Sequence, residues 1–171
     1  MVRTWDVETG FYNDVNLKGF DNNAAISDSR PLAFTLSPSG QLSATGMGTY
    51  SNPSIYLQRN RDGESRKLEV HCQPLRIVVS SDDSLIAYGD TQSVGVIDLT
   101  TGEHVFESEA GDNSIQSLHF GSGNRFLVAD VRSGGAPGVV VFDLKDRRIV
   151  QFPKVENSRS RTLWISSTAT L

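Results

Sequence analysis

The stretch LRIVVSSDDSLIAYGDTQSVGVIDLTTGEHVFES, residues 75–108, contains four short apolar runs separated by turn-forming residues. The runs are rich in Val, Ile, Leu, Tyr and Phe, and the segments between them are rich in Ser, Asp, Thr and Gly. This pattern is typical of short strands joined by tight turns. No window of a dozen residues has apolar residues spaced by three and four, so an amphipathic helix is not expected. The stretch therefore predicts four consecutive β-strands.

The same order of runs occurs in two further parts of the chain. Residues 32–70 contain the runs LAFTL, LSATG, SIYLQ and RKLEV, and residues 115–152 contain IQSLHF, RFLVAD, GVVVFD and RIVQF. The turn residues Ser37, Ser80 and Gly121 are equivalent and stand 43 and 41 residues apart. A period of roughly 20 to 50 residues is the signature of a repeat architecture. The sequence therefore predicts an all-β fold of antiparallel four-stranded units, each about 42 residues long.

Several of the runs are apolar without alternation, among them IVV, FLVA and GVVVF. Continuous apolar runs of this length are typical of strands that are covered on both faces. A four-stranded unit that lies between two others provides such an environment. The glycines at Gly40, Gly63 and Gly102 fall in the turns, where a positive φ is often needed, and we expect them to be structural.

A second pattern links the start of the chain to its later units. Residues 2–10, VRTWDVETG, contain the pair Trp-Asp followed by a turn with Thr-Gly. Residues 94–102, VGVIDLTTG, and residues 139–146, VVVFDLKD, repeat the pattern with Ile-Asp and Phe-Asp, and residues 57–58 are Leu-Gln at the same place. Over residues 2–152 the chain resembles the WD-repeat β-propeller family. The resemblance implies that one blade-core position is filled in turn by Trp5, Leu57, Ile97 and Phe142.

The resemblance implies blades of a β-propeller and an incomplete or fragmentary ring. It divides the chain into the last two strands of an incomplete blade with a loop, three blades, and the start of a further blade or a closing strand, at residues 1–28, 29–71, 72–110, 111–153 and 154–171. Three blades in a row leave sheet faces and edges uncovered at both ends, so three arrangements stay open. The chain is a segment of a longer ring, or two chains associate, or residues 2–7 and 13–18 pair with residues 161–167 in a composite fourth blade.

The function implied by the resemblance is that of a protein–protein interaction scaffold without catalytic activity of its own. The alternative is the propeller portion of a larger hydrolase or of a TolB-like periplasmic binding protein, whose active or partner domain lies outside this chain. Binding residues are concentrated in loops held by a rigid scaffold, and aromatic and Arg side chains are common anchors. The candidate interaction residues are Tyr50, His71 and Arg132. The expected partners are other proteins or further domains of the same chain, and a small molecule is not expected.

Composition narrows the range of partners. The chain has 16 Lys and Arg against 20 Asp and Glu, a net charge of −4, which disfavours binding to the phosphates of nucleic acid. The apolar runs are far shorter than the roughly 20 residues that cross a bilayer, so a soluble protein without membrane contact is expected. A single cysteine excludes an internal disulfide and favours a cytoplasmic location.

Catalytic and metal-binding patterns are absent at the level of sequence spacing. His71, Cys72, His104 and His119 form no Cys-x-x-Cys or His-x-x-x-His pattern. His71 and Cys72 are neighbours, so in an extended segment their side chains point to opposite faces and cannot form a nucleophile–base pair. No Gly-x-Ser-x-Gly elbow is present. The sequence therefore predicts no catalytic residue, no metal site and no cofactor.

Overall fold

The computed structural model describes residues 2–5, 12–15, 31–48, 51–111, 113–134 and 136–151. Within these ranges the chain forms strands and one short 3₁₀ turn, and no α-helix. The elements are β1 (Val2–Trp5), β2 (Tyr12–Val15), β3 (Pro31–Leu36), β4 (Leu42–Met47), β5 (Ser54–Arg59), β6 (Ser65–Glu69), β7 (Arg76–Val79), β8 (Leu85–Gly89), β9 (Ser93–Asp98), β10 (His104–Glu109), β11 (Ser114–Phe120), η1 (Ser122–Asn124), β12 (Phe126–Ser133), β13 (Ala136–Asp143) and β14 (Arg148–Gln151). The predicted all-β class is confirmed.

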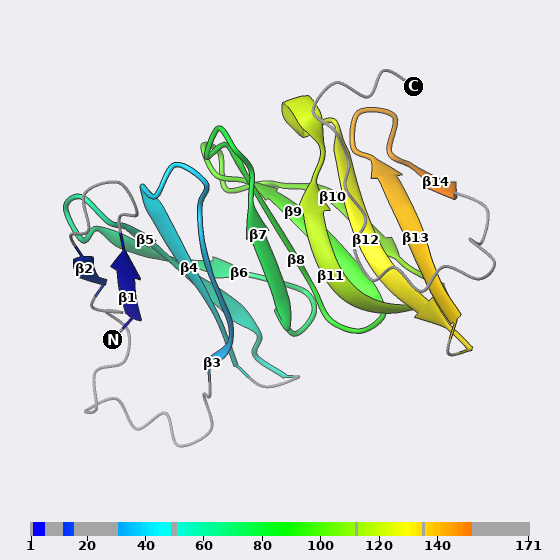
Figure 1. Ribbon diagram of the computed structural model, residues 1–171, viewed down its shortest axis with the longest axis horizontal. Helices are drawn as coiled ribbons and strands as arrows, with labels where there is room; N and C mark the ends of the chain where they lie inside the picture. The colour runs from blue at the N-terminus through cyan, green and yellow to red at the C-terminus, as the bar shows by residue number, and fades with distance from the viewer. Residues whose placement is uncertain are drawn as a thin grey trace.

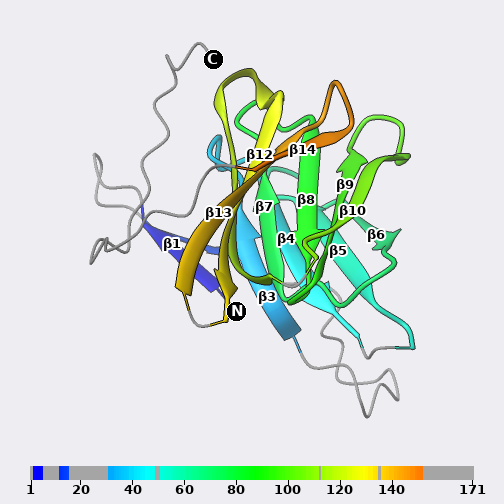
Figure 2. The same ribbon diagram turned by 90° about the vertical axis from the view of Figure 1, so that its right-hand side faces the viewer.

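Each run of four consecutive strands forms one antiparallel sheet. The first sheet contains β3 to β6, the second β7 to β10 and the third β11 to β14, each in sequence order across the sheet. β1 and β2 pair with each other in a separate two-stranded sheet. The three large sheets follow one another along the longest axis of the molecule (Figure 1). In the view turned by 90°, the third sheet lies in front of the second and the second in front of the first (Figure 2). The sheets do not close into a ring within the described residues.

The contacts that join one sheet to the next are concentrated on the first strands. β7 contacts β3 on one side and β11 on the other. The second strands take part to a smaller extent, through β4 with β7 and β8 with β11. The first strands of the three sheets therefore lie next to one another (Figure 1).

The turn between the first and second strands has the same hydrogen bonds in all three sheets. A backbone N–H just after the first strand donates to a carbonyl at the start of the second at 2.8–2.9 Å, in the pairs Ser37–Leu42, Ser80–Leu85 and Gly121–Phe126. The residue three positions further on has a positive φ in each turn: Gly40 at 71°, Asp83 at 58° and Asn124 at 56°. The turns at Ser37, Ser80 and Gly121 are therefore equivalent in structure, as their spacing in the sequence predicts.

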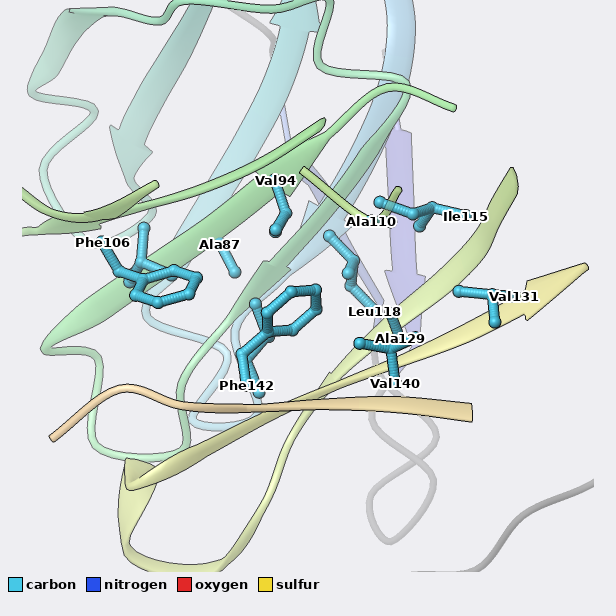
Figure 3. Close-up of a cluster of buried hydrophobic side chains, with 12 residues drawn as sticks. Ala87, Val94, Phe106, Ala110, Ile115, Leu118, Ala129, Val131, Val140 and Phe142 are labelled. Carbon is cyan, nitrogen blue, oxygen red and sulfur yellow. The ribbon is translucent and has the colours of Figure 1, made fainter. Parts of the chain in front are cut away.

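The second sheet is covered on both faces, because successive side chains of a strand point to opposite sides. In β8, Ile86 and Tyr88 pack against the first sheet, while Ala87 packs against the third. The cluster between the second and third sheets includes Phe106 and Phe142, whose rings meet edge to face with centroids 5.6 Å apart (Figure 3). This double coverage explains why the sequence of β8 is apolar without alternation.

Two of the positions that the family resemblance groups together are equivalent in the structure. Ile97 and Phe142 are both buried, and they pair with the equivalent residues Ile86 and Leu127 of the second strand. In the first sheet this register position is held by Gln58, which pairs with Ser43, so the expectation for Leu57 is wrong by one residue. The residue that follows Ile97 and Phe142 is an aspartate that accepts backbone hydrogen bonds in the next turn: Asp98 from two threonine N–H groups and Asp143 from that of Asp146. The side chain of Trp5 and residues 161–167, which enter the composite-blade hypothesis, lie outside the described part of the structure. No helix among the described residues is long and apolar enough to span a membrane.

Asp143 is buried and forms an ion pair with the half-exposed Arg125, at 2.8 Å between the closest nitrogen and oxygen. The hydrogen bond from this guanidinium lowers the pKa of Asp143 to about 2. The carboxyl of an unfolded chain has a pKa of about 3.9. A pKa that is lower in the folded state adds stability above the unfolded value, and that stability is lost as the pH falls through the folded value.

Asp143→Asn should therefore reduce the fall in stability between about pH 4 and pH 2. Asp82, whose pKa is also lowered to about 2 by hydrogen bonds from Ser84 and Ser80, remains in this variant, so the slope should decrease without vanishing. Urea unfolding at a series of pH values measures the effect. An acid profile equal to that of the wild-type chain would contradict this role of Asp143.

Candidate functional site

Four polar side chains meet between the first and second sheets. His71 lies just after β6, Tyr88 in β8, and His104 and Glu107 in β10. We call these residues the His–Tyr–Glu cluster. The side chain of Tyr88 is fully buried, those of His71 and His104 are each 34% exposed, and that of Glu107 is 50% exposed. The cluster thus connects the buried core between the two sheets to solvent.

A β-bulge places His104 and Glu107 on the same face of β10. Residues three apart in a regular strand point to opposite faces. The register of β10 against β9 shifts between His104 and Phe106, so that His104 pairs with Ile97 and Glu107 pairs with Gly95. Ile97 and Gly95 are two apart and share a face. The extra residue of the bulge therefore brings both polar side chains to the side that faces the first sheet.

Gly95 provides the space for Tyr88 to reach across the sheet. Tyr88, Gly95 and Glu107 are register partners on three neighbouring strands. A Cβ atom at position 95 would lie 2.4 Å from the Tyr88 ring and 2.8 Å from the ring of His71. The missing side chain at Gly95 allows the tyrosine ring to cover β9 and to bring its hydroxyl to the two histidines.

The four polar atoms form a closed ring of contacts. The Tyr88 hydroxyl lies 2.7 Å from Nδ1 of His71 and 3.2 Å from Nδ1 of His104. Oε1 of Glu107 lies 3.1 Å from Nδ1 of His71 and 2.9 Å from Nδ1 of His104. Beyond the ring, Nε2 of His104 lies 3.2 Å from the backbone oxygen of Glu69 in β6. Both histidines thus direct the same nitrogen to the centre of the cluster.

Burial determines the chemistry of Tyr88 and of the neighbouring Cys72. Burial raises the pKa of Tyr88 well above its ordinary range, so the phenol keeps its proton at neutral pH. Burial also raises the pKa of Cys72 to about 12, and the thiol lies 3.9 Å from the backbone oxygen of Ser93. A protonated thiol in the core is a poor nucleophile. Cys72 is therefore a packing residue of the apolar cluster between the first and second sheets.

The residues proposed from the sequence lie in different places. His71 belongs to the cluster. Arg132 is exposed near the end of β12, in register with Ser114 and Pro137. Tyr50 lies outside the described residues. The structure therefore brings His71 and Arg132 into no common site.

Sequence spacing could not reveal the cluster. Three strands, β7 to β9, separate His71 from His104 in the sequence. Only the packing of β10 against the end of β6 brings the two histidines together. His104 and Glu107 have a spacing that would place them on opposite faces of a regular strand. The one available signal is that His104 and Glu107 belong to the same predicted strand, HVFES.

The connections at one end of the second sheet are joined by backbone hydrogen bonds. Ala110, after β10, donates to the oxygen of Gln92 in the β8–β9 turn, and Ile115 donates to that of Thr91, both at 2.7 Å. Arg132 lies near the corresponding turn of the third sheet, which joins β12 and β13. We define the loop face as the exposed residues Thr91–Gln92 and Arg132.

The fold and the cluster together define an all-β chain of repeated four-stranded antiparallel sheets with one polar cluster between two of them. Neither a protein-family model nor a curated protein sequence matches the chain. Among solved structures the chain is similar to the Kuenenia stuttgartiensis hydrazine synthase, with a TM-score of 0.57 and 20% sequence identity. The match covers 71% of this chain and 36% of that one, so the chain spans about a third of the length of the structure it matches. At this identity the likeness concerns the fold alone.

Proposed function

We propose that the chain is a segment of a WD-repeat-like β-propeller and acts as a rigid protein–protein interaction scaffold without catalytic activity of its own. The observation that carries the proposal is the adjacency of β3, β7 and β11, the first strands of three successive sheets. In a propeller the first strands surround a central axis and the sheets radiate from it. Three sheets whose first strands are neighbours fit this arrangement.

The packing between the sheets supports a rigid scaffold. Two separate apolar clusters fill the space on either side of the second sheet. Backbone hydrogen bonds tie the β8–β9 turn to Ala110, after β10, and to Ile115 of β11, so this part of the loop face is held in place. A fixed set of loops on a packed frame suits the binding of a protein partner, because little conformational entropy is lost on association.

A charge reversal on the loop face tests this proposal. The test uses a partner protein that is first captured by the wild-type chain and then purified. This partner should bind the Arg132→Glu variant about tenfold more weakly than it binds the wild-type chain, as expected for loss of an interface arginine. Calorimetry with the purified partner measures the effect. Arg61→Glu is the matched control, because Arg61 is also an exposed arginine and lies in the β5–β6 turn, at the opposite end of its sheet.

The control decides between the loop face and a general effect of charge. Equal weakening by both substitutions, or weakening by Arg61→Glu alone, would contradict an interaction through the loop face. Turnover of an ester or peptide substrate by the purified chain would contradict the absence of catalysis.

A further inference from the structure

We propose that His71, His104 and Glu107 bind a divalent transition-metal ion, and that zinc is the ion best matched to them. The ligand atoms would be Nδ1 of each histidine and a carboxylate oxygen of Glu107. One ligand atom from each of the three residues lies within 4.8 Å of the other two. The proposal stands independently of the scaffold function, since it concerns the space between the first two sheets and not the loop face.

The four nitrogen–oxygen contacts of the cluster cannot all be hydrogen bonds at once. An imidazole nitrogen has a single in-plane direction, in which it holds either one proton or one lone pair. Each Nδ1 atom in the cluster nevertheless faces two oxygens, those of Tyr88 and Glu107, at 2.7–3.2 Å. The two nitrogens can therefore serve at most two of the four contacts. A cation at the centre would use both lone pairs at once and also attract the carboxylate.

A backbone contact prepares His104 for metal binding. The oxygen of Glu69 can only accept a hydrogen bond, so Nε2 of His104 must carry the proton of their contact. In a neutral imidazole this leaves a lone pair on Nδ1, directed at an oxygen of Glu107 2.9 Å away. Two lone pairs at this distance repel each other, and either a proton on Nδ1 or a cation bound by both atoms removes the repulsion. A histidine whose second nitrogen donates to a backbone carbonyl is the usual arrangement at metal sites.

The separations of the ligand atoms fit zinc after small movements. Zinc bonds of about 2.0–2.2 Å in a tetrahedron place neighbouring ligand atoms about 3.3–3.6 Å apart. The nitrogens of His71 and His104 lie 3.1 and 2.9 Å from the oxygen of Glu107. Entry of the ion therefore requires each nitrogen and the oxygen to move apart by a few tenths of an ångström. The two histidine ligand atoms, which lie within 4.8 Å of each other, must also adjust, and the partial exposure of all three side chains allows such movements. Two nitrogen ligands favour zinc over magnesium or calcium, which prefer oxygen.

The fourth position of the ion would be open to water, next to the Tyr88 hydroxyl. The ion would also connect two sheets, because His71 follows β6 of the first sheet and the other two ligands belong to β10 of the second. Bound zinc should therefore stabilise the folded chain as well as occupy the cluster.

Calorimetric titration of the tag-free chain with zinc chloride tests the proposal. We expect one ion per chain, and binding at least about tenfold weaker in His104→Ala and in Glu107→Gln, because loss of even an outer contact at a metal site costs about 10–100-fold in affinity. Zinc should raise the melting temperature of the wild-type chain and not that of His104→Ala. Magnesium chloride should give no saturable binding.

His119→Ala is the matched control. His119 is the remaining histidine of the chain and lies on the third sheet, where it contacts Ser117 and Asp130. This variant should bind zinc as the wild-type chain does. Glu107→Gln keeps the size of an exposed side chain, and circular dichroism should show that it folds. Absence of zinc binding by the wild-type chain, or equal weakening in His119→Ala and His104→Ala, would overturn the proposal.

Discussion

Replacing Phe142 with alanine should lower the free energy of unfolding by about 3–5 kcal/mol, the cost of removing a large aromatic side chain from a packed core. Phe142 is completely buried, and its ring packs edge to face on Phe106 from the neighbouring sheet. The substitution removes apolar burial and leaves a cavity between the second and third sheets. Figure 3 shows the side chains that surround Phe142. Urea denaturation followed by circular dichroism measures the loss.

The matched control for Phe142 is its register partner on β14. Ile149 pairs with Phe142 across the strands but is 41% exposed. Ile149→Ala should therefore cost less than about 1 kcal/mol, as is usual for exposed positions. If both substitutions cost the same, the cluster between the second and third sheets would not hold the sheets together in the way we describe.

Replacing Gly95 with alanine should cost about 1–3 kcal/mol, the usual range for overpacking, and should disrupt the His–Tyr–Glu cluster. The added Cβ would lie 2.4 Å from the ring of Tyr88, which is fully buried and cannot move into solvent. Gly138, a glycine in β13, is the control, because a Cβ there would make an ordinary contact of 3.4 Å with Val131. Gly138→Ala should cost much less. The measurement is again chemical denaturation.

A double substitution separates the clash from other effects. Tyr88→Leu removes the ring atoms that meet the new Cβ. The combined variant Gly95→Ala, Tyr88→Leu should therefore be destabilised by less than the sum of the two single changes. Strict additivity would mean that the glycine is needed for a reason other than the space it leaves for Tyr88.

The sequence was sufficient to predict the elements of the fold, because local chemistry determines them. The runs of Val, Ile and Leu became strands, and the turn residues at Ser37, Ser80 and Gly121 close three equivalent turns. The buried positions Ile97 and Phe142 also follow from the repeating pattern, whereas Leu57 lies one residue away from the position that the pattern assigned to it. These features depend on residues close together in the chain.

The candidate site could not be predicted in the same way, because long-range packing and one irregular residue create it. His71 and His104 meet only after β10 packs beside the end of β6. The bulge after His104 reverses the face on which Glu107 would otherwise lie, and no simple sequence rule marks that extra residue. From the sequence, Tyr88 is expected to be an ordinary core residue of an apolar strand. The structure shows that its hydroxyl contacts the imidazoles of His71 and His104.

The coverage of the second sheet on both faces has a consequence for cooperativity. In a nearest-neighbour description of a repeat protein, stability is the sum of the intrinsic terms of the units and the terms of their interfaces. Among the three large sheets, the second takes part in two interface terms, one through Tyr88 and Ile86 and one through Ala87. Unfolding of the second sheet removes both interface free energies at once. The second sheet therefore couples the folding of the first sheet to that of the third.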